Sequence, residues 1–159
     1  MAEKSVYNVR CALGGDIAFL CDIDTNVKSY DYPISGSMFA SFMASKNQCV
    51  MIVTEYDKPV GYYIYRVLSD RLFLLRLLVF PGNEAGSYVI ERLRAKLTSA
   101  RPLLVTTVSE LNLAQLQLLR QCGWRAEALL RGCYGERDGI LLCYRRRAEE
   151  LIGADPLYC

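Results

Sequence analysis

The sequence contains no histidine among its 159 residues. A Ser-His-Asp triad and a Cys-His pair are therefore excluded, because each needs an imidazole as its base. Metal sites built on imidazole are excluded for the same reason. Any proton transfer near neutral pH has to use a carboxylate, a tyrosine, a cysteine, an amine or water.

The sequence also lacks a marked excess of charge and a long apolar run. Nineteen basic and seventeen acidic residues give a net charge of +2, which is too small to predict binding to nucleic acid or to an anionic membrane. No apolar run approaches the roughly 20 residues of a membrane span, and the polar start is not followed by a signal-peptide core. We therefore expect a soluble, cytoplasmic protein.

Patterns typical of metal sites are missing as well. The seven cysteines are scattered without zinc-site spacing, and most lie in apolar runs, so we expect buried, unpaired thiols in a reducing compartment. Asp22 and Asp24 form a carboxylate pair without a third ligand, which favours a turn at a helix end. The sequence therefore predicts no metal.

What the sequence does contain is enough apolar material, 52% of its residues, for one globular core. We expect a single domain over residues 1–148 and a C-terminal tail over 149–159. Hydrophobic periodicity predicts strands at 7–11, 49–55, 60–68, 72–80, 103–108, 124–131 and 140–145, and helices at 17–24, 35–45, 86–100 and 112–122. This order predicts a mixed α/β sheet with helices on its faces.

Three stretches of the second half resemble motifs of the GNAT N-acyltransferases. "NLAQLQLLRQCGW", residues 112–124, resembles the family's second conserved motif, in which an asparagine opens a helix that ends in Gly-Phe. "LLVFPGNEAGSY" resembles the strand, loop and helix start that hold acetyl-CoA, and "RGCYGERDGILLCYR" resembles the last hairpin. The element order matches over essentially the whole chain. The sequence looks nearest to enzymes that acetylate protein N-termini.

The resemblance implies a fold and a reaction. The fold would be a GNAT-like, mostly antiparallel sheet of about seven strands flanked by about four helices. The reaction would be transfer of an acetyl or other acyl group from acyl-CoA to an amine-bearing small molecule or a peptide N-terminus. A homodimer is possible for such a fold. Direct attack of the amine on the thioester needs no histidine, so the missing histidines agree with this family.

The resemblance also implies site residues. Backbone groups of the strand would pair with the pantetheine arm, the amide near Leu77 would polarise the thioester, and the loop and helix start would bind the pyrophosphate. The expected cofactor-binding set is Leu77, Leu78, Val79, Glu84, Ala85, Gly86, Ser87, Tyr88 and Asn112. Tyr134 is the candidate acid. Glu110 is the candidate base acting through water, and a charge that complements a helix dipole is an equal interpretation of it.

The loop and the helix depart from the family pattern. Tyr88 stands where a second small residue is usual, and Glu84 would oppose phosphate binding. Leu119 occupies the position of the tyrosine that protonates the thiolate in many members. These departures leave a second hypothesis, an inactive GNAT-fold module that binds acyl-CoA or a protein partner. A third hypothesis is an α/β scaffold protein unrelated to the family.

Two further groups of residues have more than one interpretation. The tyrosines at 30, 32, 62, 63 and 65 border the acceptor groove of such a fold, but strand tyrosines that pack across a sheet are the more ordinary case. The run Arg145–Arg147 could contact RNA or an acidic partner. It is followed at once by Glu149 and Glu150, which favours a solvated terminus.

Overall fold

One sheet of seven strands runs through the part of the chain that the computed structural model describes, residues 6–27, 30–82 and 84–147. Its strands are β1 (Tyr7–Cys11), β2 (Gln48–Glu55), β3 (Lys58–Val67), β4 (Arg71–Val79), β5 (Leu103–Ser109), β6 (Arg125–Tyr134) and β7 (Arg137–Arg145). They lie in the order β1-β2-β3-β4-β5-β7-β6, and only β4 and β5 are parallel neighbours. The predicted mixed, mostly antiparallel sheet is therefore confirmed.

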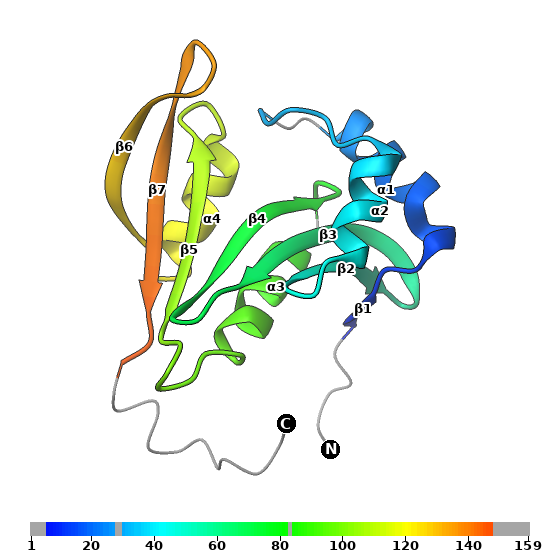
Figure 1. The fold of residues 1–159 in the computed structure, drawn as a ribbon, viewed down its shortest axis with the longest axis horizontal. Coiled ribbons are helices and arrows are strands. Elements are labelled where there is room, and N and C mark those ends of the chain that lie inside the picture. The colour runs from blue at the N-terminus through cyan, green and yellow to red at the C-terminus, as the bar shows by residue number, and fades with distance from the viewer. Residues whose placement is uncertain (1–5, 28–29, 83, 148–159) are drawn as a thin grey trace.

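Four α-helices of the described residues cover the two faces of the sheet (Figure 1). They are α1 (Ile17–Asn26), α2 (Gly36–Ala44), α3 (Ala85–Arg94) and α4 (Leu113–Gln121), and a single 3-10 turn, η1 (Gly14–Asp16), precedes α1. Ser35 begins α2 as an N-cap, because its hydroxyl accepts a hydrogen bond from the Met38 N–H. No helix within the described ranges is long and apolar enough to cross a membrane.

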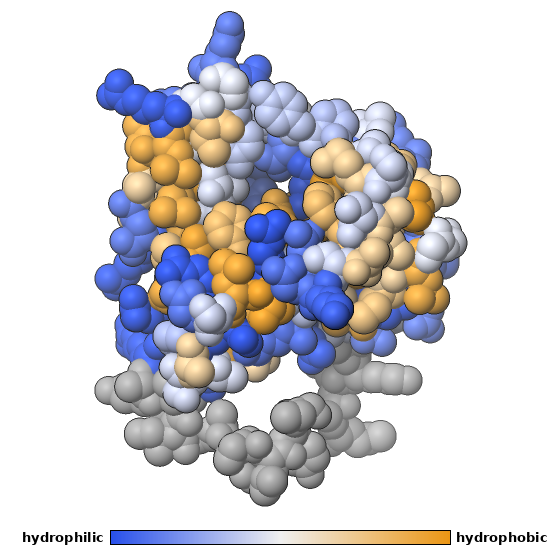
Figure 2. Space-filling model, viewed as in Figure 1, coloured by the Kyte–Doolittle hydropathy of each residue, from blue (hydrophilic) through white to orange (hydrophobic). Residues whose placement is uncertain are grey.

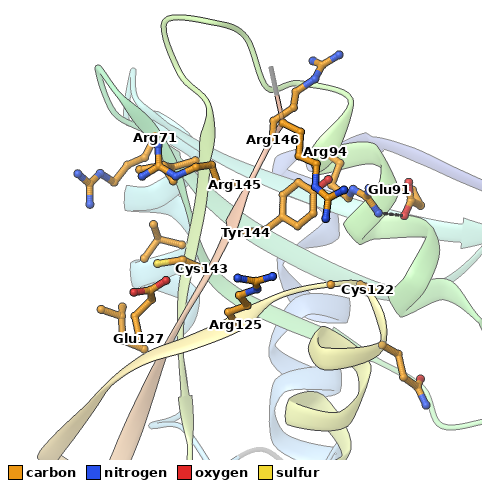
Figure 3. A pocket seen from close by; sticks show the side chains of 16 residues that line it. Arg71, Glu91, Arg94, Cys122, Arg125, Glu127, Cys143, Tyr144, Arg145 and Arg146 are labelled. Atoms are coloured by element: carbon orange, nitrogen blue, oxygen red, sulfur yellow. Dashed lines mark hydrogen bonds and ion pairs between the residues drawn. The ribbon is translucent and has the colours of Figure 1, made fainter. Parts of the chain in front are cut away.

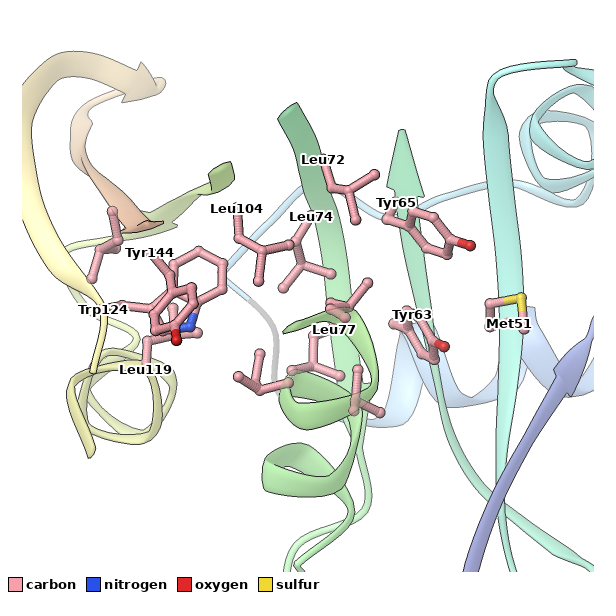
Figure 4. Packing of buried hydrophobic residues seen from close by; sticks show 14 of the residues in the cluster. Met51, Tyr63, Tyr65, Leu72, Leu74, Leu77, Leu104, Leu119, Trp124 and Tyr144 are labelled. Carbon is pink, nitrogen blue, oxygen red and sulfur yellow. The ribbon is translucent and has the colours of Figure 1, made fainter. Parts of the chain in front are cut away.

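Strand alternation divides the core into two layers, because successive side chains of a strand point to opposite faces of the sheet. On one face Phe39 of α2 packs in a cluster with Ile52 of β2. On the other face α3 and α4 pack against the sheet. There Leu119, Trp124 and Tyr144 gather beside α4 (Figure 4).

The helix predicted over residues 86–100 is shorter than expected, since α3 ends at Arg94. The N–H groups of Lys96 and Leu97 bond to carbonyls three residues back, at Leu93 and Arg94, which is the tighter bonding typical of a last helical turn. The prediction was wrong there because apolar periodicity does not reveal where hydrogen bonding tightens.

The last hairpin is tighter than predicted. Strand β6 continues to Tyr134 and β7 begins at Arg137, so a two-residue turn replaces the expected turn over 135–139. Gly135 has a φ of +75°, which glycine adopts without the strain that other residues meet. The predicted tail, 149–159, lies outside the described residues.

The cysteines are less buried than expected. The six in the described residues are unpaired, with Cys11 and Cys133 exposed and the other four half-buried. The prediction of buried thiols was therefore wrong about burial. The apolar runs that contain them lie partly on strands with one open face.

Strands β4 and β5 separate from each other about halfway along their length (Figure 1). Their pairing runs from Arg71 opposite Leu103 to Leu74 opposite Thr106 and then stops. At the same point the register between β3 and β4 shifts, so that Leu75 is left without a partner, as in a β-bulge. Beyond the bulge, one edge of β4 faces a gap in the sheet.

Candidate functional site

A cavity of about 430 Å³ lies where β4 and β5 separate. The residues that line it come from the end of α1, the second half of β4 and the first turns of α4: Asn26, Val27, Leu77, Leu78, Val79, Phe80, Pro81, Asn112, Ala114, Gln115 and Leu118. None of these residues carries a charged side chain. The molecular surface is hollowed between the part formed by β5, β6 and β7 and the part that carries α1 and α2 (Figure 2).

Backbone N–H groups of β4 are directed into this gap. The Phe80 N–H donates to the Val60 carbonyl of β3 at 2.8 Å. Because peptide groups alternate in direction along a strand, Leu78 shares the orientation of Phe80. Leu77 and Val79 therefore direct their N–H and carbonyl groups to the opposite side, toward the cavity. An extended ligand could pair with them as an additional strand.

The structure brings together one part of the predicted cofactor-binding set. Leu77, Leu78, Val79 and Asn112 all line the cavity. Asn112 is also the N-cap of α4, where its side-chain oxygen accepts from the Gln115 N–H at 3.2 Å. Its position at the cavity is therefore fixed by the start of the helix.

The residues predicted to hold the pyrophosphate do not line the cavity. Glu84 is the exposed N-cap of α3, and Ala85 is buried. Gly86 is buried against α4, where an added Cβ would lie 2.8 Å from Leu118 Cδ2. Ser87 is exposed, and the ring of Tyr88 lies against that of Tyr7, with centroids 5.8 Å apart.

The two predicted catalytic residues are already hydrogen-bonded. The Tyr134 hydroxyl donates to the Thr107 carbonyl at 2.9 Å, and burial, together with the charge of Asp31, raises the pKa of that hydroxyl. Glu110 Oε1 accepts from the Asp138 N–H at 3.1 Å. Their roles stay predictions. The Tyr134 hydroxyl would have to break its hydrogen bond to donate a proton, whereas Glu110 can accept a proton at its other oxygen without losing the bond to Asp138.

Leu119 does not face the cavity. It is fully buried in the core beside Trp124, whereas its neighbour Leu118 lines the cavity. The helix face that meets the gap therefore carries Ala114, Gln115 and Leu118. The apolar pattern of α4 does not distinguish the two leucines.

The sequence did not predict a buried ionic cluster that lies on β4 next to Leu77 of the cavity lining. Arg76 of β4, with a side chain 5% exposed, lies 2.8 Å from Asp24 of α1 and 3.1 Å from Asp31. Its Nη2 also donates to the Tyr32 carbonyl at 2.6 Å, and Tyr62 donates its hydroxyl proton to Asp24. A single arginine inside the apolar run 72–80 was the available signal. Asp24 is thus an ion-pair partner and not the helix-end turn residue that was expected.

The tyrosines predicted to border an acceptor groove have two different surroundings. Tyr62 and Tyr63 are fully buried, and Tyr63 stacks with Tyr65 at 5.9 Å between centroids, which is the ordinary packing role. Tyr32 is 71% exposed, and its hydroxyl lies close to Gly135 of the last hairpin. Only Tyr32 of these four is therefore free to contact a ligand.

A second cavity, of about 1090 Å³, shares no lining residue with the first. Arginines dominate its lining: Arg71, Arg94, Arg125, Arg145, Arg146 and Arg147, with Glu91 and Glu127. The Arg94 guanidinium lies over the Tyr144 ring at 4.5 Å and bonds to Glu91 (Figure 3). Arg145 and Arg147 are exposed, as predicted, but Arg146 is half-buried and donates to the Leu97 carbonyl.

The chain has the GNAT fold. It is similar to the ribosomal-protein-S18-alanine N-acetyltransferase of Escherichia coli, with a TM-score of 0.71 and 19% identity over 96% of this chain and 99% of that one. It is also similar to the spermidine N-acetyltransferase of Vibrio cholerae in complex with CoA and spermine, with a TM-score of 0.75 and 13% identity over 94% of this chain and 100% of that one.

A third similar structure is Arabidopsis thaliana NAA60 in complex with a bisubstrate analogue. Its TM-score is 0.73 at 13% identity, over 89% of this chain and 98% of that one. No protein-family model matches the sequence, and no curated protein matches it by sequence. The similarity of these structures confirms the fold expected from the resemblance.

Proposed function

We propose that this chain transfers an acyl group from acyl-CoA to a primary amine. The observation that carries the proposal is the apolar cavity at the parted strands, into which Leu77 and Val79 direct backbone N–H groups. A pantetheine arm is an extended, amide-bearing chain that could pair with them. The V. cholerae neighbour is in complex with CoA, and the E. coli neighbour is an N-acetyltransferase, which supports acyl transfer to amines.

The proposed reaction requires few catalytic side chains. A neutral amine attacks the thioester carbonyl, the new C–N bond forms, and the C–S bond breaks to release a thiolate. The Leu77 N–H would stabilise the charge that develops on the carbonyl oxygen, as an oxyanion donor. The amine proton would leave to water or to a base such as Glu110. The apolar lining would keep water from the thioester.

The test is release of free CoA from acetyl-CoA in the presence of amines of different classes. Suitable acceptors are a peptide with a free N-terminal amine, a lysine side chain in a blocked peptide, spermidine and an aminoglycoside. Free thiol is measured with a thiol reagent, and the acetylated amine is identified by mass spectrometry. We expect amine-dependent release with at least one acceptor.

A pair of variants tests the backbone donor directly. Leu77→Pro removes the N–H that faces the cavity, and Leu77→Ala removes the same side chain but keeps the N–H. Because that N–H does not pair with β3, proline is tolerable in the strand at this position. We expect kcat of the proline variant to be roughly 100-fold below that of the alanine variant. Equal rates in two folded variants would remove Leu77 from the mechanism.

The alternative function is a GNAT-fold module that binds acyl-CoA or a protein partner without turnover. Calorimetric binding of acetyl-CoA with no CoA release from any acceptor would support it. The GNAT fold rules out the hypothesis of an unrelated scaffold, so absence of acetyl-CoA binding would leave a protein partner as the ligand of this module. The unpaired cysteines of the described residues fit a reducing, cytoplasmic setting, and a homodimer stays a prediction.

A further inference from the structure

The connection between β4 and α3 offers few groups to a phosphate. It spans five residues, from Phe80 to Glu84, between the end of β4 at Val79 and the start of α3 at Ala85. The Phe80 N–H is bonded to β3 and the Glu84 N–H donates to the Tyr7 hydroxyl at 3.1 Å. Pro81 has no N–H. Three of the four described residues of this connection therefore have no N–H left for a ligand.

Charge at this place also opposes an anion. Glu84 lies at the N-terminus of α3, where the helix dipole is positive and a phosphate would otherwise be favoured. Its carboxylate is exposed and makes no capping hydrogen bond. The cavity lining, which runs along β4 as far as Pro81, contains neither lysine nor arginine among the described residues.

Gly86 serves packing between helices. An added Cβ would meet Leu118 of α4 at 2.8 Å, so the space left by the missing side chain is already filled by a leucine. A glycine that allows close approach of a phosphate would need that space open. The most family-like residue of the loop therefore contributes to the contact between α3 and α4.

The part of the site that would hold the pantetheine arm has neither a shortage of N–H groups nor an opposing charge. Leu77 and Val79 direct N–H groups toward a cavity of about 430 Å³ with an apolar, uncharged lining. The site therefore fits the pantetheine arm of acyl-CoA well and its phosphate groups poorly.

On the basis of the proposed acyl transfer, we infer that the acyl donor is recognised through its acyl-pantetheine arm, while the adenine nucleotide of CoA adds little affinity. The arm could come from CoA or from a phosphopantetheinylated carrier protein. In both cases the thioester and the two amides of the arm occupy the cavity. The group beyond the arm lies outside it, near Glu84.

Calorimetric titration tests the inference without requiring turnover. CoA, pantetheine and adenosine 3′,5′-bisphosphate are titrated separately into the purified full chain. We expect Kd values for CoA and pantetheine within tenfold of each other, similar at 50 and 300 mM salt, and no binding of the nucleotide. CoA binding 100-fold tighter than pantetheine, binding of the nucleotide alone, or no binding of either pantetheine compound would each overturn the inference.

Steady-state kinetics then separate this inference from the proposed function and identify the source of the arm. Acetyl-pantetheine, acetyl-CoA and an acetylated acyl carrier protein are compared with one acceptor. Similar kcat/KM for the first two supports the inference, and a kcat/KM more than tenfold higher for the carrier protein assigns the arm to that source. A kcat/KM for acetyl-CoA 100-fold above that for acetyl-pantetheine would overturn the inference and leave the proposed acyl transfer valid. Binding of the donors without turnover of any of them would overturn the proposed acyl transfer but not the inference about binding.

A matched pair of variants locates the unfavourable charge. Glu84→Gln removes the carboxylate at the start of α3, and Glu91→Gln removes one in the second half of the same helix, where Glu91 bonds to Arg94. We expect the first variant to tighten CoA binding twofold to fivefold while pantetheine binding stays unchanged. The second variant should alter neither. Equal effects of both variants would contradict a local role for Glu84.

Discussion

The surroundings of Tyr134 are unfavourable for a proton donor. Its hydroxyl donates to the Thr107 carbonyl, and burial and Asp31 raise its pKa. A thiol has an ordinary pKa of roughly 8.5, so a thiolate gains little by taking a proton from a phenol whose pKa is above its usual value. The local contacts therefore favour a structural role, in which Tyr134 joins β6 to β5.

The variant Tyr134→Phe separates the two roles. We expect the free energy of unfolding to fall by about 1 kcal/mol, because the Thr107 carbonyl loses its side-chain partner, and kcat to fall less than tenfold. Urea unfolding and the CoA-release assay measure the two quantities. Tyr56→Phe, at a hydroxyl on a 74% exposed residue, is the control. A kcat loss of roughly 100-fold without loss of stability would instead establish Tyr134 as a general acid.

At the scale of elements, the packing of α3 on α4 controls the shape of the cavity at the parted strands. Gly86 and Leu118 are the contact, and Leu118 is also part of the cavity lining. Any side chain added at Gly86 has to displace the end of Leu118. The cavity and the interface between the helices therefore change together.

The variant Gly86→Ala should lower the free energy of unfolding by about 1 kcal/mol, since overpacking outweighs the better helix propensity of alanine. Donor binding should weaken several-fold because Leu118 is displaced. In a Leu118→Ala background the same change should stabilise the protein by up to about 1 kcal/mol, since only the propensity difference remains. Urea unfolding of the four proteins gives the coupling. If Gly86→Ala changed the free energy of unfolding in the same direction in both backgrounds, Leu118 would not be the residue that obstructs the added methyl group.

At the scale of the whole molecule, Arg76 joins three parts of the chain beside the cavity. Its guanidinium contacts Asp24 on α1, Asp31 in the following segment and the Tyr32 carbonyl. Tyr32 in turn lies close to Gly135 of the last hairpin. Arg76 thereby fixes the segment after α1 to β4.

Replacing Arg76 by methionine should lower the free energy of unfolding by about 3–5 kcal/mol, because Asp24 would be left as an uncompensated buried charge. The double variant Arg76→Met/Asp24→Asn should recover part of that loss. Arg71→Met, at an arginine of the same strand whose side chain is 40% exposed, should leave stability almost unchanged. Urea unfolding compares the four proteins. A loss below 1 kcal/mol in Arg76→Met would mean that water or another cation compensates Asp24.

The sequence by itself determined those features that depend on neighbours within a few positions. Apolar runs and apolar alternation placed all seven strands, and Asn112 was found as the start of α4 because its cap bond reaches only to Gln115. The departures of the predicted phosphate loop from the family pattern were also visible, since Glu84 and Tyr88 are local properties. Boundaries such as the end of α3 were missed where hydrogen bonding, and not periodicity, sets the limit.

Only the tertiary structure decided features that join distant positions. Arg76 meets Asp24, 52 positions away, and Tyr134 meets Thr107, 27 positions away. The packing of Gly86, the residue predicted to lie beside a phosphate, against Leu118 was likewise not visible in the sequence. Local patterns carry the conformational preferences of a segment, whereas the partner of a buried charge or the space beside a glycine depends on how the helices and strands pack, and no short stretch of the sequence encodes that packing.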